Sequence, residues 1–224
     1  HRNIPDSRVS LAQNIVDLEP ARPGAADAAA VAAWDRFMHL DLLDRARETG
    51  SLDFLGINYY TRIFVRDSPL PLVLLGTLPG YAEVEATLGT RLFGWLGGRR
   101  GEAPRTKMGW EIVPEGFERV LLRAAERYRL PIMVTENGLA EADGAGPEAR
   151  REQFLRGHLA ALGRAIQGGA KVVGYLHWSL IDNYEWGSFA PRFGLFSVDR
   201  ANGLRRMPAG GSEYYSQVAK SNSI

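Results

Sequence analysis

An apolar run that ends in a carboxylate decides the fold of this chain: Ile132-Met133-Val134-Thr135-Glu136-Asn137-Gly138. Its apolar start predicts a strand, and the glycine that closes it predicts a turn. In barrels of alternating strands and helices, catalytic side chains gather at the carboxyl ends of the strands. Glu136 is therefore a candidate catalytic residue, although a glutamate that merely caps or salt-bridges a surface turn is also common.

Helical patterns flank this strand on both sides. Pro114 opens a helix predicted over about 115–129, and one face of it is apolar: Phe117, Val120, Leu121, Ala124 and Tyr128. A loop over 138–147 leads to a second helix, predicted over about 148–168. Its apolar face contains Phe154, Leu155, His158, Leu159 and Leu162. We interpret His158 as a residue of this helix face rather than as a ligand.

Further out, the same alternation continues. Strands are predicted over 8–15, 52–61 and 172–180, and a helix over about 25–47. The apolar residues of that helix are expected to pack: Val31, Trp34, Phe37, Met38 and Leu42. A regular succession of strand and helix predicts parallel β/α units, hence an α/β fold.

Between Arg62 and Lys107 the pattern dissolves into one long connection. Connections of this length are typical of binding loops or disordered segments. Its hydrophobic residues Leu92, Phe93 and Trp95 fit either a lid or a contact surface. The apolar run within 68–81 is too short to span a bilayer. We therefore expect a single domain over 1–224 with a long variable loop at about 62–107.

The composition is that of an ordinary globular domain, with 45% hydrophobic and 24% charged residues. The balance of 27 basic against 26 acidic residues gives no reason to expect nucleic acid as a partner. The absence of cysteine excludes disulfides and thiolate metal sites, and four scattered histidines do not predict a zinc site. Because the chain begins at His1 without a signal-peptide pattern, we expect a piece of a longer, by default cytoplasmic, polypeptide.

Three motifs in this order resemble glycoside hydrolase family 1, the β-glucosidase family. They lie at 53–60, at 135–138, and at 178–186 followed by Arg192-Phe193-Gly194-Leu195, with the turn Met108-Gly109-Trp110 between the first two. The resemblance covers essentially the whole chain and is weakest over 62–107. It implies an eight-fold (β/α) barrel of the TIM type, of which this chain resembles only the carboxyl-terminal half, strands five to eight.

The resemblance also implies roles for residues at the strand ends. Glu136 matches the nucleophile, which attacks the anomeric carbon and forms a covalent glycosyl-enzyme intermediate. Tyr60 matches the tyrosine whose hydroxyl bonds that carboxylate, and Asn58 matches a polar partner near the same site. Each could instead be an ordinary strand-end residue.

The implied sugar site comes from the last part of the chain. Trp178 matches an aromatic platform under the sugar, with a buried core tryptophan as the alternative. Glu185 and Trp186 match the pair that binds the outer hydroxyls of the terminal sugar, and Phe193 would help to wall this subsite. A carboxylate would repel a phosphorylated sugar, so we expect an unphosphorylated glycoside. The spacing from Glu185 to Phe193 is one residue tighter than the common family pattern.

One half of the implied machinery is missing. Retaining glycosidases use two carboxyl groups ~5 Å apart, and the family's acid/base glutamate follows an asparagine at the end of strand four. No Asn-Glu-Pro occurs in this chain. The spare carboxylates nearest in sequence do not match that position: Glu111, Glu115, Glu141 and Asp182.

A half-barrel would expose two strand edges and an open inner face, so something must cover it. A second chain or an upstream segment that supplies strands one to four is one solution, and a homodimer is another. In either case we expect a retaining β-glycosidase that uses no cofactor. The alternative function is a non-catalytic carbohydrate-binding half-barrel. Neither membrane nor nucleic acid is expected as a partner.

Overall fold

A four-stranded parallel sheet forms the centre of the computed structural model, which describes residues 6–67, 83–84, 102–141, 147–185 and 187–224. Its strands are β1 (Ala12–Asn14), β3 (Leu55–Tyr59), β6 (Ile132–Asn137) and β7 (Val172–His177), and their order in the sheet is their order in the chain. Each of the four predicted strands is found, and each is shorter than predicted. The carboxyl ends of all four therefore meet at one edge, where Asn58 lies in register with Glu136.

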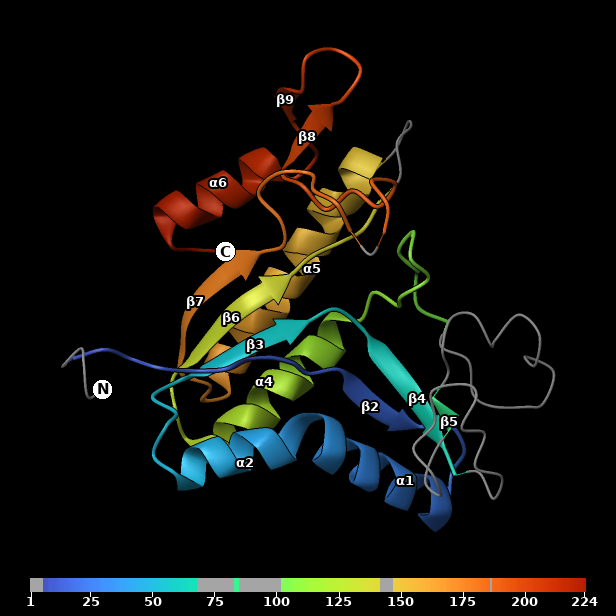
Figure 1. The fold of residues 1–224 in the computed structure, drawn as a ribbon, viewed down its shortest axis with the longest axis vertical. Helices are drawn as coiled ribbons and strands as arrows, with labels where there is room; N and C mark the ends of the chain where they lie inside the picture. Colours follow the sequence, from blue (N-terminus) through green and yellow to red (C-terminus); the bar gives the residue numbers. More distant parts are fainter. Residues whose placement is uncertain (1–5, 68–82, 85–101, 142–146, 186) are drawn as a thin grey trace.

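One face of this sheet is covered by the two helices that the sequence predicts most clearly (Figure 1). These are α4 (Pro114–Tyr128), which Pro114 opens, and α5 (Pro147–Gln167). Their predicted apolar faces are buried as expected, against the alternate residues of β3 and β6. His158 is fully buried within this core. The core thus lies between sheet and helices and holds the strand ends in place.

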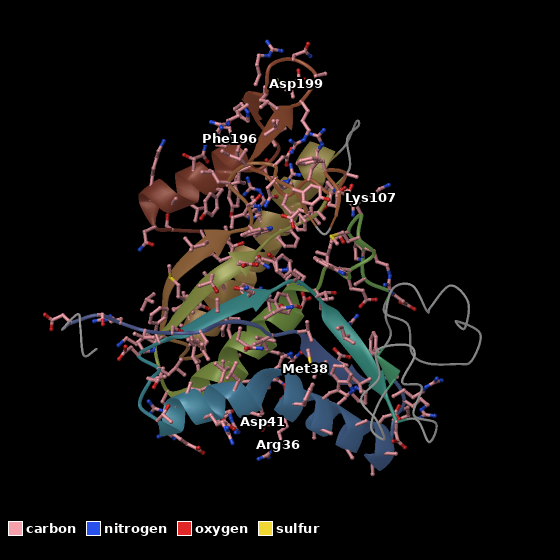
Figure 2. The ribbon with its side chains drawn as sticks, in the orientation of Figure 1. Arg36, Met38, Asp41, Lys107, Phe196 and Asp199 are labelled. Atoms are coloured by element: carbon pink, nitrogen blue, oxygen red, sulfur yellow. The ribbon has the colours of Figure 1, made fainter. Side chains whose placement is uncertain are left out.

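The predicted first helix is interrupted by a π-helical turn. It consists of α1 (Ala25–Asp35), the π-turn η1 (Arg36–Leu40) and α2 (Asp41–Glu48). The expectation that Phe37, Met38 and Leu42 pack is wrong, because their exposed fractions are 57%, 44% and 57%. A π-turn adds a residue to the helical repeat and rotates the face that follows it. Figure 2 shows Arg36, Met38 and Asp41 along this stretch.

Val31 and Trp34, which precede the π-turn, do pack as predicted. They contact a small core cluster of Leu18, Ala30 and Val65. Leu18 and Val65 of this cluster belong to a second sheet, which the sequence did not predict. The sheet contains β2 (Asp17–Pro20), β4 (Arg62–Arg66) and the two-residue β5 (Glu83–Val84).

The second sheet corrects one boundary of the predicted long loop. Arg62 does not begin an irregular connection, because residues 62–66 pair in parallel with β2. The expected aromatic cluster at 92–95 lies outside the described residues. At the other end of the chain, the hairpin of β8 (Phe196–Asp199) and β9 (Arg205–Pro208) and the helix α6 (Ser212–Ser221) were also not predicted.

The central sheet does not close. Its outermost strands are β1 and β7, and each has one edge without a neighbouring strand in the described part of the chain. Large apolar side chains are exposed on β7, including Val173 and Leu176. In the described residues, no helix is long and apolar enough to cross a membrane.

Candidate active site

Glu136 and Tyr60 meet at the carboxyl edge of the central sheet. Glu136 is the fifth residue of β6, and Tyr60 directly follows the neighbouring strand β3. The Tyr60 hydroxyl donates a hydrogen bond of 2.6 Å to Oε2 of Glu136. Sequence reasoning paired these two residues 76 positions apart, and the parallel pairing of β3 with β6 brings them together.

The environment of Tyr60 keeps its hydroxyl a donor. Burial is the largest cause that raises the pKa of Tyr60, followed by its hydrogen bond to Glu136 and the charge of that carboxylate. The phenol therefore remains protonated far above neutral pH. An acceptor oxygen of Glu136 is thus held in one position by a donor that does not titrate.

Asn58 lies next to this pair but bonds a different residue. Its Oδ1 accepts a hydrogen bond of 2.5 Å from the hydroxyl of Thr135. Thr135 immediately precedes Glu136 in β6, so this bond ties the end of β3 to the residue before the carboxylate. Asn58 therefore contributes to the placement of β6 beside β3.

Asn137 has a larger structural role than the sequence indicated. Its side chain is fully buried and makes two hydrogen bonds of 2.8 Å, one from Nδ2 to the carbonyl oxygen of Tyr59 and one from the Tyr175 hydroxyl to Oδ1. These bonds join β3, β6 and β7 at their carboxyl ends. The signal in the sequence was a polar residue just before a glycine at a strand end.

Gly138 allows the chain after β6 to approach β7 closely. A Cβ atom at this position would overlap the carbonyl oxygen of Trp178. Trp178 in turn donates its backbone N–H to the carbonyl oxygen of Asn137 at 3.0 Å. The glycine therefore determines how near the tryptophan lies to the strand that carries Glu136.

Trp178 and Glu185 are also brought together. The indole Nε1 of Trp178 donates a hydrogen bond of 2.9 Å to Oε1 of Glu185, whose residue is 7% exposed. The tryptophan ring is only partly buried, unlike that of a core residue. Trp186 lies outside the described residues. An aromatic surface beside a carboxylate is a suitable arrangement for a polyhydroxylated ligand.

Phe193 packs behind Tyr60 rather than presenting a surface of its own, since it is 1% exposed. Its ring centroid lies 6.2 Å from that of Tyr60 and 6.4 Å from that of Trp110. Trp110 also lies 5.5 Å from Tyr60. The sequence places Trp110 in a turn of the family motif but does not by itself indicate that this residue contacts the site.

Buried charges hold the turn that carries Trp110. The carboxylate of Glu111 accepts hydrogen bonds from Arg62, at 2.8 and 3.0 Å, and from Arg105, at 2.8 Å. Thr106 adds a hydrogen bond of 3.2 Å from the Trp110 N–H to its hydroxyl oxygen. The aromatic group beside Tyr60 is thus anchored through β4.

The remaining carboxylates considered from the sequence have other partners or lie in solvent. Glu111 is engaged as above, and Glu115 is exposed in the first turn of α4. Asp182 accepts bonds from the N–H groups of Gly194 and Val198 and from Arg192. Glu141 lies near Arg150, and burial raises its pKa.

A family model described as "Glycosyl hydrolase family 1" matches residues 36–224. The chain is 42% identical to a "Beta-galactosidase" of Saccharolobus solfataricus over 151 residues, which are 67% of this chain and 28% of that protein. It is 33% identical to "Beta-glucosidase A" of Thermotoga maritima over 180 residues, 77% of this chain and 35% of that protein. The matched region thus spans about a third of the length of these curated relatives.

Among solved structures, the fold is similar to that of "Family 1 b-glucosidase from Thermotoga maritima", with a TM-score of 0.79 and 27% identity. That match covers 100% of this chain and 53% of the other. The predicted fold class is confirmed: the chain has the TIM-barrel type of architecture, and it corresponds to about half of such a barrel.

Proposed function

Because the chain belongs to glycosyl hydrolase family 1, we propose that it carries the nucleophile and sugar-binding half of a retaining β-glycosidase. The substrates are unphosphorylated β-D-glucosides or related β-glycosides. The observation that carries this proposal is the hydrogen bond of 2.6 Å from Tyr60 to Glu136 at the carboxyl edge of the sheet.

In this proposal Glu136 attacks the anomeric carbon of the sugar, and the leaving group departs as the glycosyl-enzyme ester forms. Water then hydrolyses the ester and restores the carboxylate, with retention of configuration. Tyr60 orients one oxygen of Glu136 so that the other is directed at the sugar. Neither step requires a cofactor.

The sugar binds on Trp178 and Glu185. A pyranose presents C–H groups to the indole face and hydroxyl groups to the carboxylate, which accepts their hydrogen bonds. Trp186 is proposed to bind the outer hydroxyls beside Glu185, while Phe193 and Trp110 support Tyr60 from behind. A phosphate at the outer positions would face the negative charge of Glu185, which opposes the binding of phosphorylated sugars.

The acid/base carboxyl group comes from outside this chain. Of the carboxylates considered from the sequence, Glu111, Asp182 and Glu141 have other partners and Glu115 is exposed to solvent, and no Asn-Glu-Pro occurs. Strands one to four of the barrel, in an upstream segment or a second chain, would supply this group. They would also cover the free edges of β1 and β7. A homodimer would cover the edges but would not supply the acid.

A mechanism-based label tests the nucleophile without the acid/base. An activated 2-deoxy-2-fluoro-β-D-glucoside with a dinitrophenyl leaving group needs little protonation, so its sugar should attach to Glu136. Peptide mass analysis should find the added sugar on the peptide that contains Glu136. The label should be lost in Glu136→Gln and retained in Glu48→Gln, which removes an exposed carboxylate on α2. Equal labelling of Glu136→Gln and the unaltered chain would refute the role of Glu136.

A second candidate function is sugar binding without turnover, which the missing acid/base favours. It predicts affinity for glucose or cellobiose that falls in Trp178→Ala and is unchanged in Glu136→Gln, measured by calorimetric titration. A covalent label on Glu136 would exclude this alternative. Catalysis is preferred because binding alone gives no reason for the bond between Tyr60 and Glu136.

A further inference from the structure

A cavity of about 370 Å³ opens between two outer helical segments of the fold. One wall belongs to α1 and the π-turn η1, the stretch that Arg36 and Met38 mark in Figure 2, and the other belongs to α4. None of the residues proposed for the glycosidase site lines it. Its volume is in the range of small-molecule sites, and both walls come from this chain.

The floor of the cavity is apolar. It is formed by Ile15, Val120 and Ala124, which belong to the main core and have exposed fractions of 4%, 1% and 6%. These three side chains are almost covered, and the half-buried Leu40 in the same lining adds apolar surface that a flat ligand can contact. The floor therefore favours an aromatic ring over a sugar or a simple ion.

The rim is polar, and most of its charges already have partners. Arg127 and the Tyr128 hydroxyl both bond the carboxylate of Asp44. Asp35 accepts a bond of 2.8 Å from Nδ1 of His39, whose Nε2 accepts one of 3.3 Å from the N–H of Val16. Burial raises the pKa of Asp35, but the hydrogen bond from His39 and the charges of Arg123 and Arg127 lower it, and the net effect is a lowered pKa.

Arg123 is the exception on this rim. Its side chain is 45% exposed, and its one hydrogen bond within the described residues is a long one, 3.4 Å to Oδ1 of Asp35. A guanidinium has five N–H donors arranged to match a carboxylate with two parallel bonds. Glu126 also lines the cavity and, like Arg123, is exposed to solvent. Within the described residues, the long bond to Asp35 leaves most of the N–H donors of Arg123 unused.

We propose that this cavity is a binding site for a small aromatic carboxylate, with its ring on Ile15, Val120 and Ala124 and its carboxylate on Arg123. The π-turn supports this assignment. Such turns often occur at functional sites, and here the turn carries His39 into the cavity wall, while Asp35 directly precedes the turn and accepts the bond from Arg123. The site is independent of the proposed glycosidase function.

Three indoles with the same ring and different charge test the proposal: indole-3-acetate, indole-3-acetamide and tryptamine. We would titrate each into the 224-residue chain and follow the methyl NMR signals of Ile15, Val120 and Ala124. The acetate should shift these three signals saturably, and with higher affinity than the amide or the amine. Absence of shifts at these methyl groups, or equal or tighter binding of the amide or tryptamine, would overturn the proposal.

Variants separate this site from unspecific binding to exposed apolar surface. Arg123→Gln should lower the affinity for indole-3-acetate about tenfold, because a charge-assisted hydrogen bond is lost. Ala124→Phe should fill the floor and abolish the shifts. Arg47→Gln removes an exposed charge from α2 outside the cavity and should leave affinity unchanged. If the acetate binds Arg123→Gln as tightly as the unaltered chain, the site is refuted, whether or not Ala124→Phe folds.

Discussion

Gly138 determines the approach of Trp178 to the strand that carries Glu136. In Gly138→Ala the new methyl group would overlap the Trp178 carbonyl oxygen, which is backbone and cannot rotate away. We expect the free energy of unfolding to fall by about 2 kcal/mol, as for an overpacked site. Urea denaturation followed by circular dichroism measures this change.

Gly163→Ala is the matched control for that prediction. A methyl group at this position in α5 would lie 3.5 Å from Cδ1 of Ile224, which is an ordinary contact. Because alanine favours a helix interior over glycine, stability should rise by up to about 1 kcal/mol. A loss of stability in Gly163→Ala comparable to that in Gly138→Ala would contradict the account of close approach.

His158 makes stability dependent on pH. Complete burial lowers the pKa of His158 from 6.5 to about 4, so the folded state is neutral where the unfolded state binds a proton. The contribution of neutral His158 to the free energy of unfolding is fully present above pH 6.5. It is lost as the pH falls from about 6.5 towards about 4. Between pH 7.5 and pH 5, protonation of this single group in the unfolded state should lower the free energy of unfolding by about 2 kcal/mol.

His158→Phe should remove that part of the pH dependence. The free energy of unfolding, measured by urea denaturation at pH 7.5 and at pH 5, should differ by about 2 kcal/mol less in the variant than in the unaltered chain. Ile57→Val, which removes a methyl group from the same core and no titratable group, should lower both values equally. If the difference between the two pH values is unchanged in His158→Phe, the pKa of His158 does not differ between the folded and unfolded states.

At the scale of elements, the turn over 104–112 depends on strand β4. Arg62→Met would leave the buried carboxylate of Glu111 bonded to Arg105 alone, and Glu19 would lose its bond to Arg62. Breaking a buried ion pair is costly because one charge stays buried, so we expect a loss of about 3 kcal/mol in guanidinium denaturation.

Arg105→Met tests the same turn from its exposed side. The Arg105 side chain is 44% exposed and that of Arg62 is 14% exposed, although both bond Glu111. Since exposed partners of ion pairs contribute little, this variant should lose less than about 1 kcal/mol. Equal losses in the two variants would show that burial does not govern the strength of this anchor.

At the scale of the molecule, an open sheet should associate. Strand β7 has a free edge in the described chain, and Leu176 on it is 48% exposed. Such edges pair with other chains unless something covers them. We therefore expect the isolated chain to show an apparent mass that rises with concentration in sedimentation velocity experiments.

Leu176→Lys should reduce this association, because a charge on an edge strand opposes pairing. Leu204→Lys is the control, since Leu204 is also exposed, at 59% against 48% for Leu176, but lies in the turn between β8 and β9. If the unaltered chain stays monomeric at all concentrations, its sheet edges are protected within the chain itself. If both variants reduce association equally, the β7 edge is not the contact.

The sequence by itself determined the four strands of the central sheet, the three longer helical segments, the buried faces of α4 and α5, and Glu136 as the candidate reactive group. These features depend on local periodicity and on residues such as Pro114 and Gly138, which constrain the backbone wherever they occur. The contact of Tyr60 with Glu136 requires β3 and β6 to be neighbours in the sheet, which local patterns do not indicate. The sequence therefore implied this contact only through the family resemblance.

Only the tertiary structure decided the features that join distant residues. The π-turn exposed Phe37 and Met38, which helical periodicity alone would bury, and β2 paired with β4 inside the predicted loop. Asn137 bonds Tyr59 and Tyr175, and Trp110 contacts Tyr60, across separations that no local pattern encodes. A side chain's partners follow from packing and strand register, and these depend on the whole chain at once.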